Sequence, residues 1–320
     1  MKMIMTKTPF RISFCGGGTD IPSFYQKYGG CVVSSTIDKY VYITMIKSFY
    51  SSIILKYSEV ENVTNVDEIK HSIFKEILRG NGIKGVEINS TSDIPAGTGL
   101  GSSSAFTVGL LNAVKAYNGQ SAFKKMLAEE ACDVEIQKLK APIGKQDQYA
   151  SAFGGLNYIK FNRDSSVDVE PIPLSLEDKK RMFDNLLMFY VGGTRSASKV
   201  IEGYNNVESL KSLSRLAEKL NNNLKSGDIQ SLGKILDEGW RIKKSVSGDI
   251  SNEQIDEIYD IAINNGASGG KLLGAGSKGF MLFYAEKDCH DSIRKALSSY
   301  RELKFTFDND GSQVVYNDTI

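Results

Sequence analysis

The hydrophobic residues of this 320-residue chain follow two kinds of spacing, which divide it into strands and helices. Residues 31–37 and 40–46 are rich in β-branched and aromatic side chains, which suit a pleated sheet, and they predict strands. Residues 67–79 place apolar side chains three and four positions apart, which predicts an amphipathic helix that ends at Gly80. Residues 1–60 are therefore expected to be mainly strands.

The rest of the chain continues this mixture of strands and helices. An acidic, proline-containing stretch at 164–178 interrupts it and indicates a boundary between two halves. We therefore expect an α+β protein with one domain at 1–175 and a second at 176–320. Further strands are expected at 86–95, 154–161, 186–192, 280–286 and the chain end, and helices at 103–119, 122–140, within the amphipathic stretch up to 264, and at 288–300.

Composition narrows the class of protein. Hydrophobic residues make up 41% of the chain and charged residues 24%, as in a folded globular protein. The formal net charge is +1 and no dense Lys/Arg cluster is present, which argues against a nucleic-acid partner. No apolar run approaches the roughly 18 residues that a membrane span needs, and no signal peptide is recognisable. A cytoplasmic protein with no membrane partner is therefore expected.

Cysteine and histidine give little support to a zinc site or a disulfide framework. The four cysteines are widely separated and form no CxxC pair, and the two histidines have no fixed spacing to other ligands. Reduced thiols in a cytosol are the simpler interpretation. The chemistry is therefore expected from other side chains.

The densest cluster of glycine and serine is PAGTGLGSSSA, residues 95–105, between a predicted strand and a predicted helix. Its glycines let the backbone turn sharply and approach a ligand without interference from a Cβ atom. Its serines add hydroxyl groups at the helix start, where unpaired N–H groups and the helix dipole favour an anion. A phosphate-binding loop is predicted, although a flexible turn with a serine helix cap would share this composition.

Two common phosphate motifs do not account for this loop. The sequence contains no GxxxxGK[ST] motif, so a Walker-type loop is excluded. Residues 274–279, GAGSKG, match GxGxxG by letters, but they precede a predicted strand instead of following one. A Rossmann dinucleotide site is therefore disfavoured.

Three segments together resemble the GHMP kinases, the superfamily of galactokinase, homoserine kinase, mevalonate kinase and phosphomevalonate kinase. PAGTGLGSSSA is similar to their phosphate loop, PFRISFCGGGTDIPSF at 9–24 to their N-terminal substrate motif, and GGKLLGAGSKGFMLF at 269–283 to their C-terminal glycine motif. The resemblance spans nearly the whole chain and implies an ATP-dependent kinase with the active site in the cleft between two domains. ATP would contact Pro95, Ala96, Gly97, Thr98, Gly99, Leu100, Gly101, Ser102, Ser103 and Ser104.

The resemblance also implies the catalytic groups. Glu135 and Ser103 match the family's magnesium ligands, and hard oxygen donors suit Mg²⁺. Asp147, in a polar segment between a helix and a strand, matches the catalytic aspartate that accepts or orients the proton of the acceptor hydroxyl. Arg11 matches an arginine that faces this acid and keeps it ionised. On the residues alone, Glu135 could be a solvated helix carboxylate and Asp147 a helix cap.

The acceptor site is indicated by CGGGTD, which is similar to the sugar-kinase branch of the superfamily. Asp20 would bind sugar hydroxyls, and Gly17, Gly18 and Thr19 would line the same site. On the residues alone, this segment could instead be a tight turn capped by Asp20.

Together with GKQDQYASAFGG and YVGGTRSAS, this segment most resembles kinases that phosphorylate the anomeric hydroxyl of D-glycero-D-manno-heptose 7-phosphate, a step towards nucleotide-activated heptose for bacterial surface glycans. Arg195 is the first candidate for binding the phosphate of this sugar phosphate, because its planar fork suits phosphate better than the ammonium groups of Lys47 and Lys199. On the residues alone, any of the three could instead be a surface residue.

Alternatives remain open at this stage. A neutral-sugar 1-kinase, similar to a fucokinase or galactokinase, would share the catalytic residues, whereas a catalytically silent sensor is disfavoured because all of them are present. Ser277 and Lys278 replace two glycines of the family's third motif, and Lys278 could reach a phosphate or point outward. The helical stretch 205–264 could form a homodimer interface or complete the second domain.

Overall fold

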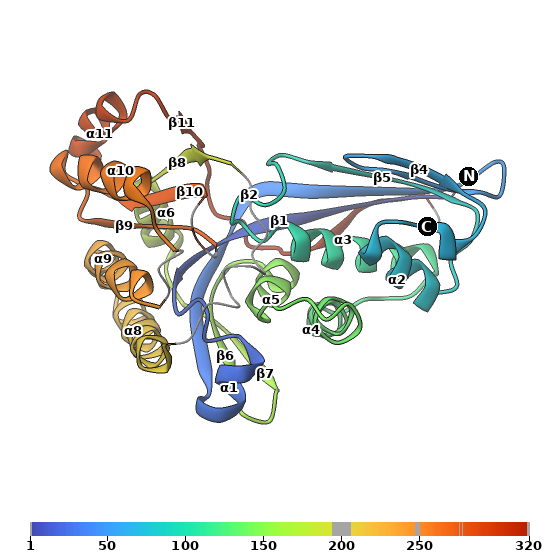
Figure 1. Cartoon of the computed structure of the whole chain (residues 1–320), viewed down its shortest axis with the longest axis horizontal. Helices are drawn as coiled ribbons and strands as arrows, with labels where there is room; N and C mark the ends of the chain where they lie inside the picture. The colour runs from blue at the N-terminus through green and yellow to red at the C-terminus, as the bar shows by residue number, and fades with distance from the viewer. Residues whose placement is uncertain (1, 194–205, 247–249, 275, 277, 319–320) are drawn as a thin grey trace.

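Two β-sheets and the helices packed on them make up the part of the chain that the structure describes (Figure 1). The structure is a computed structural model, and its described residues are 2–193, 206–246, 250–274, 276 and 278–318. Strands and helices are mixed along the chain, and the strand pairs are antiparallel except for β3 with β5. The predicted α+β class is therefore confirmed.

The larger sheet has eight described strands in the order β12-β1-β2-β5-β3-β4, and β6 and β7 extend it from β2. The long strand β2 pairs with β5 over residues 41–47 and with β6 over residues 30–35. The strands predicted at 31–37 and 40–46 are therefore parts of one strand. The bounds are β1 Met3–Cys15, β2 Gly30–Lys47, β3 Ile53–Lys56, β4 Val60–Val63, β5 Val86–Ser92, β6 Leu156–Phe161, β7 Val167–Pro171 and β12 Gln313–Asn317.

Helices α2, α3, α4 and α5 lie on one face of the larger sheet (Figure 1). Helix α3 packs on β1 and β2, and its residues 107–115 are all buried. A helix that is apolar on most sides is typical of such a buried position, and the packing fixes its first turn next to the predicted phosphate loop. The bounds are α1 Pro22–Tyr28, α2 Ser72–Gly80, α3 Ser102–Tyr117, α4 Lys124–Cys132 and α5 Gln146–Phe153.

The smaller sheet, in the order β11-β8-β10-β9, carries the second group of helices. One buried cluster contains residues of both sheets, such as Ile12 of β1 and Leu282 of β10, so the core continues from one lobe into the other. A second cluster surrounds Trp240 and Phe283. The bounds are α6 Leu176–Asp184, β8 Leu186–Gly192, α8 Val207–Lys225, α9 Ser231–Lys244, α10 Glu253–Asn264, β9 Gly269–Leu272, β10 Gly279–Tyr284, α11 His290–Ala296 and β11 Arg301–Glu302.

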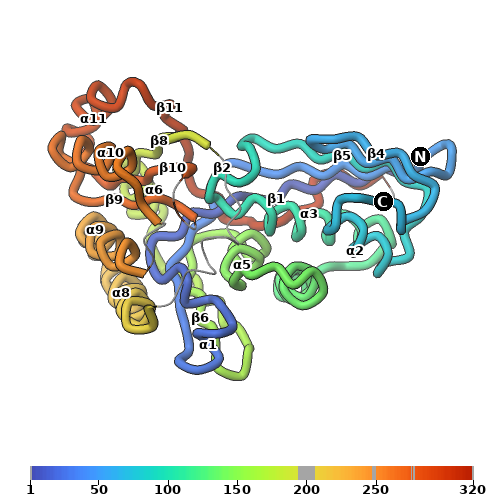
Figure 2. The backbone as a smooth tube through the Cα atoms, viewed as in Figure 1, coloured from blue at the N-terminus to red at the C-terminus, as the bar shows by residue number. Residues whose placement is uncertain are grey.

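The last strand returns to the first lobe, as the red end of the chain in Figure 2 shows. In this pairing β12 is antiparallel to β1, with Asn317 opposite Ile4 and Gln313 opposite Lys7. The predicted domain 176–320 therefore does not hold for residues 313–317, which belong to the larger sheet. A short strand gives no sign in its own residues of which sheet edge it joins.

Two predicted elements around the candidate site differ from the structure. The helix predicted at 122–140 is α4 followed by a π-helical turn, Asp133–Lys138. The polar segment that contains Asp147 was expected between elements, but it forms the short helix α5. An isolated helix of this length is marginal in water, and α5 is stabilised by packing against α3, α4 and β1.

The helical stretch after residue 205 packs within the chain. Helix α8 contacts β1, β2 and α9, while α9 packs on β9 and α10 on α11. These contacts are compatible with the alternative in which the stretch completes the second lobe, and a homodimer remains a prediction. Within the part of the chain that the structure describes, no helix has both the length and the apolar character needed to cross a bilayer.

Candidate active site

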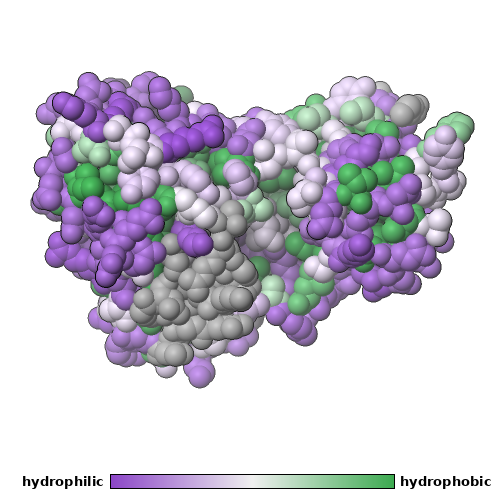
Figure 3. Space-filling model, turned by 45° about the horizontal axis from the view of Figure 1, so that its top comes forward, coloured by the Kyte–Doolittle hydropathy of each residue, from purple (hydrophilic) through white to green (hydrophobic). Residues whose placement is uncertain are grey.

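A cavity of about 910 Å³ lies between the two lobes, where Figure 3 shows the surface to be hollowed. The first lobe contributes Arg11 of β1, the segment 95–104 in part, and Asp147 of α5. The second lobe contributes Lys243 of α9 and Lys271 of β9. The cavity is thus lined from both lobes, as expected of a cleft between domains.

The predicted phosphate loop borders this cavity and leads into α3. Gly97, Gly99 and Gly101 all have positive φ angles, of 75°, 88° and 78°, which only glycine adopts without strain. Gly101 precedes the first residue of α3, and Ser102 Oγ accepts the N–H of Gly97 at 3.3 Å. Unpaired N–H groups at this helix start can therefore bind an anion.

Most of the predicted loop contacts line the cavity, but two do not. Thr98 and Leu100 are fully buried. The Thr98 hydroxyl donates to the carbonyl of Pro95 at 3.0 Å, and the Leu100 carbonyl accepts the N–H of Arg11 at 3.1 Å. These two residues therefore stabilise the loop from behind. The predicted residues that do line the cavity are Pro95, Ala96, Gly97, Gly99, Gly101, Ser102, Ser103 and Ser104.

The C-terminal glycine motif packs backbone to backbone against the phosphate loop. A Cβ atom on Gly99 would lie 2.5 Å from the carbonyl oxygen of Leu273, and one on Gly279 would lie 2.3 Å from that of Thr98. Gly274 would likewise meet Gly99. The motif therefore supports the loop, and Lys278, which it also contains, lines the cavity with an exposed side chain.

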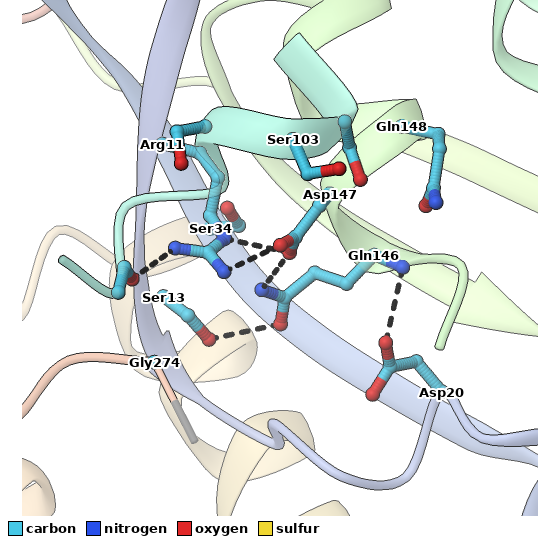
Figure 4. Close-up of polar contacts among 12 residues, drawn as sticks. Arg11, Ser13, Asp20, Ser34, Ser103, Gln146, Asp147, Gln148 and Gly274 are labelled. Atoms are coloured by element: carbon cyan, nitrogen blue, oxygen red, sulfur yellow. Dashed lines mark hydrogen bonds and ion pairs between the residues drawn. The ribbon is translucent and has the colours of Figure 1, made fainter. Parts of the chain in front are cut away.

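Arg11 and Asp147 form a bidentate ion pair on the floor of the cavity (Figure 4). Arg11 Nε and Nη2 donate to Asp147 Oδ1 and Oδ2, both at 2.7 Å, and Arg11 Nη1 donates to the Gly99 carbonyl at 2.6 Å. The Arg11 side chain is 7% exposed and that of Asp147 27%. The predicted pairing is confirmed, and it joins the carboxylate to the phosphate loop.

Sequence reasoning missed two residues that orient this pair. Gln146 Nε2 donates to Asp147 Oδ1 at 3.1 Å, and the Ser13 hydroxyl donates to Gln146 Oε1 at 2.9 Å (Figure 4). Ser13 lies two positions from Arg11, so both side chains leave the same face of β1. The alternation of side chains along β1 can be predicted from the sequence, whereas the contact of Ser13 with Gln146 on α5 cannot.

Asp20 connects the loop after β1 to the start of α5. Asp20 Oδ1 accepts the N–H of Gly18 at 3.0 Å, and Oδ2 accepts the N–H of Gln146 at 3.1 Å. Burial, together with the charge of Asp147, raises the pKa of the Asp20 carboxyl above its usual value. The bond from the Gly18 N–H to Asp20 is the turn cap that the sequence allowed as an alternative. Asp20, Gly17 and Gly18 also line the cavity.

Two of the other residues predicted for the acceptor, Thr19 and Lys47, do not line the cavity. Thr19 is fully buried, and its hydroxyl donates to the carbonyls of Gly16 and Cys31, so it holds the loop rather than facing the site. Lys47 is exposed at the end of β2 and does not line the cavity. Arg195 and Lys199 lie outside the described residues.

Glu135 lies on the π-helical turn and is 2% exposed, which excludes a solvated helix carboxylate. Its Oε1 accepts the Ser103 hydroxyl at 2.8 Å, and its Oε2 accepts from Ser104 at 2.8 Å and from Gln148 at 2.7 Å. Burial raises the pKa of this carboxyl. Widened turns of this kind are frequent at functional sites.

The oxygen donors of Ser103 and Glu135 fit a hard cation such as Mg²⁺. Both residues line the cavity beside the phosphate loop, and a cation there would favour the ionised carboxylate. The described residues contain no group of three or more His, Cys, Asp or Glu arranged to hold a metal. A site with few protein ligands suits Mg²⁺, which usually keeps water and phosphate oxygens as its other ligands.

Comparisons with known proteins give matches over most of the chain. A family model described as the GHMP kinases N terminal domain matches residues 68–155, and one described as GHMP kinases C terminal matches residues 216–302. The chain is 32% identical to D-glycero-alpha-D-manno-heptose 7-phosphate kinase from Campylobacter jejuni, covering 93% of this chain and 94% of the relative. It is 27% identical to galactokinase from Pyrococcus furiosus, covering 96% of each chain.

Solved structures show the same fold. A D-glycero-D-manno-heptose 1-phosphate kinase from Bacteroides thetaiotaomicron has a TM-score of 0.82 and 25% identity, covering 98% of this chain and 99% of the other. The galactokinase of Lactococcus lactis, complexed with galactose, has a TM-score of 0.76 and 16% identity, covering 98% and 95%, and this likeness shows the fold alone.

Proposed function

The chain belongs to the GHMP kinases, and from this premise we propose that it transfers the terminal phosphoryl group of ATP to the anomeric hydroxyl of D-glycero-D-manno-heptose 7-phosphate, giving the 1,7-bisphosphate. The observation that carries the proposal is the Arg11–Asp147 pair, which is joined to the phosphate loop by the bond from Arg11 to Gly99. The 32% identity to a heptose 7-phosphate kinase supports this acceptor. The reaction would take place in the cytoplasm and feed surface glycan synthesis.

The phosphate loop would hold the triphosphate of ATP. The N–H groups at the start of α3 and the positive end of its dipole favour the phosphate oxygens, and the glycines allow the backbone to approach them. Ser103 and Glu135 would hold Mg²⁺, which supplies positive charge to the phosphates when it is bound. The protein's own contribution there is a buried carboxylate held in place by three donors.

Asp147 would accept the proton of the acceptor hydroxyl or orient that hydroxyl for attack. Arg11 would keep the carboxylate ionised and would add positive charge beside the phosphoryl group in transfer. Gln146 and Ser13 would keep the Asp147 carboxylate in one orientation, since both belong to its hydrogen-bond chain. Asp20, Gly17 and Gly18 would contact the sugar.

A neutral-sugar 1-kinase is the second candidate. The observation in its favour is the similarity to galactokinases over most of the chain, as with the 27% identity to the Pyrococcus furiosus enzyme. Both candidates use the same catalytic residues, and they differ in whether the site binds a phosphate on the acceptor. Arg195, proposed for that phosphate, lies outside the described residues and does not help to decide.

The decisive experiment measures ADP release with D-glycero-D-manno-heptose 7-phosphate, the corresponding 1-phosphate, the free heptose, galactose and fucose, followed by ³¹P NMR of the product. We expect turnover with the 7-phosphate and a new phosphate on C1. Turnover with unphosphorylated sugars alone would favour the second candidate. Binding of sugars and ATP without any ADP release would contradict both and indicate a sensor.

A further inference from the structure

Two lysines of the second lobe line the cavity, and the proposed mechanism does not use either one. Lys243 is the second-last residue of α9, and Lys271 lies in β9. Each residue is 6% exposed, and each lines the cavity. Among the residues that the structure describes, neither forms a salt bridge with a carboxylate or the chain terminus.

The contacts of both ammonium groups are with backbone carbonyls. Lys271 Nζ donates to the carbonyl oxygen of Ser13 at 2.8 Å and to that of Phe14 at 3.2 Å. Lys243 Nζ donates to the carbonyl oxygen of Gly274. A protonated amine has three N–H donors, so the bonds to described residues leave one donor on Lys271 and two on Lys243.

Burying these charges is costly, and the cost is not offset by nearby acids. Burial, with the charges of Lys271 and Arg11, lowers the pKa of Lys243 well below its usual value, although Asp20 acts in the opposite direction. Burial, with the charge of Arg11, lowers the pKa of Lys271 to about 8. Both oxygens of Asp20 already accept backbone N–H groups. An anionic ligand beside these two amines would favour their protonated form and offset the cost of burial, so the unpaired lysines favour an anion site.

The contacts of the lysines place them near the loop that carries Asp20, where the acceptor is proposed to bind. In Figure 4, Gly274 and Asp20 lie on one side of the Arg11–Asp147 pair, and Ser103 lies on the other. Lys243 is bonded to Gly274, and Lys271 is bonded to the end of β1 that leads to Asp20. Ser103, at the helix end of the phosphate loop, is bonded to Glu135, the other proposed magnesium ligand. Lys271 therefore lies beside the strand that leads to the acceptor loop, and Lys243 lies where Gly274 contacts Gly99, at the border between the acceptor loop and the phosphate loop.

We propose that Lys243 and Lys271 form the subsite for the phosphate group that the acceptor sugar already carries. The inference rests on the proposed function and deepens it, because it assigns residues that select a phosphorylated sugar over a neutral one. A phosphate dianion offers several acceptor oxygens to the N–H groups of both lysines, and its charge would favour the protonated form of the two buried amines. The acceptor of a neutral-sugar kinase carries no phosphate group that these two lysines could bind.

The inference is tested with Lys243→Met and Lys271→Met, which remove the charge and keep most of the side-chain volume. With heptose 7-phosphate we expect each variant to raise KM about 10- to 100-fold, as for a lost charge-assisted hydrogen bond in a buried site. KM for ATP and kcat/KM for the unphosphorylated heptose should stay within about threefold of the wild type. Lys244→Met is the matched control, because Lys244 is adjacent on α9 and pairs with Asp256.

Other outcomes contradict the inference. An equal loss with both acceptors would assign the lysines to the common reaction or to folding, and a raised KM for ATP would assign them to the triphosphate. Unchanged kinetics with heptose 7-phosphate would show that the acceptor's phosphate binds elsewhere. If the wild type does not turn over heptose 7-phosphate at all, the proposed function fails, and that result is visible before any variant is made.

A measurement on the wild-type protein avoids reliance on variants that fold poorly. Inorganic phosphate, used as the probe, should slow the modification of Lys243 and Lys271 by an amine-selective reagent, as followed by peptide mass mapping, and should leave Lys244 unaffected. It should also compete with heptose 7-phosphate at saturating ATP. Equal labelling rates at both lysines with and without phosphate would overturn the assignment, whatever the enzyme's substrate proves to be.

Discussion

At the scale of single residues, the site depends on how its charges are paired. Arg11 is buried and has one carboxylate partner among the described residues, Asp147. Removing one partner of a buried pair is more damaging than replacing both, because the remaining charge has nothing to offset it. The ion pair therefore has two roles, since it holds Arg11 in place and keeps the proposed base ionised.

Replacing Asp147 by asparagine keeps the shape of the side chain and removes its charge. We expect kcat to fall by about 10²- to 10⁴-fold, the usual contribution of a positioned general base. ATP binding should change little, because the phosphate loop keeps its own contacts. Steady-state kinetics and nucleotide titration would measure the two effects separately.

The control for this substitution is Asp260→Asn, on the exposed face of α10. It makes the same chemical change far from the cavity and should leave kcat unaltered. If Asp147→Asn retained full activity with a normal melting temperature, Asp147 would have no part in proton transfer or in orienting the hydroxyl.

At the scale of elements, the phosphate loop and the C-terminal glycine motif act as one unit. Their backbones touch at Gly99, Gly274 and Gly279, where no side chain fits. This contact explains why two glycine-rich segments far apart in sequence occur in one chain. The loop keeps its shape because the motif from the other lobe packs behind it.

Gly99→Ala tests this contact. A Cβ atom there would lie 2.5 Å from the Leu273 carbonyl, so the loop or the motif must shift. We expect KM for ATP to rise at least tenfold and the free energy of unfolding to fall by about 2–3 kcal/mol, combining the strained φ with the steric clash. ATP kinetics and urea unfolding measure both changes.

Gly119→Ala provides the matched comparison. Gly119 also has a positive φ, of 72°, but a Cβ atom there would meet nothing within 4 Å. Gly119→Ala should therefore lower the free energy of unfolding by only about 1 kcal/mol, because of the left-handed backbone, and should leave KM for ATP unchanged. Similar effects of the two substitutions would show that the backbone contact is unimportant.

At the scale of the whole molecule, the two lobes share one core, and the last strand of the chain pairs with the first. The larger buried cluster includes residues of both sheets, and β12 pairs with β1 at the other end of the chain. Ser312, just before β12, also contacts Thr8 and Asn112 through its hydroxyl. Unfolding of either lobe should therefore expose part of the core of the other.

Removing residues 312–320 tests this coupling. The deletion eliminates the β12–β1 pairs, each worth about 0.5–1.5 kcal/mol net, so we expect a loss of about 2–5 kcal/mol of stability. Trp240, the one tryptophan of the chain, is fully buried in the second lobe and reports on that lobe by fluorescence.

We expect the fluorescence and circular dichroism transitions of the truncated protein to coincide and to shift together, as they would in a single cooperative unit. The full-length protein measured in parallel is the reference. A Trp240 transition that stays at its full-length midpoint, while the first lobe melts earlier, would show that the lobes unfold independently.

On the residues alone, features that depend on neighbouring residues in the sequence could be predicted, whereas features that depend on distant residues could not. The phosphate loop and the start of α3 were predictable, because positive φ angles and helix starts depend on neighbouring residues. Helix α5 was not, because a helix of eight residues is marginal by itself and is stabilised by packing on α3 and α4. The same reason explains why Thr19 and Thr98 could not be recognised as buried supports.

The sequence by itself determined the local elements, the anion-binding character of residues 95–105 and, through resemblance, the pairing of Arg11 with Asp147. The tertiary structure decided how distant segments meet. It placed Arg11 and Asp147, 136 positions apart, within 2.7 Å, joined β12 to β1, and buried Lys243 and Lys271 in the same cavity. A local pattern predicts the conformation of one segment. The partner of a buried charge depends on how distant segments pack together, and no single stretch of the sequence contains that information.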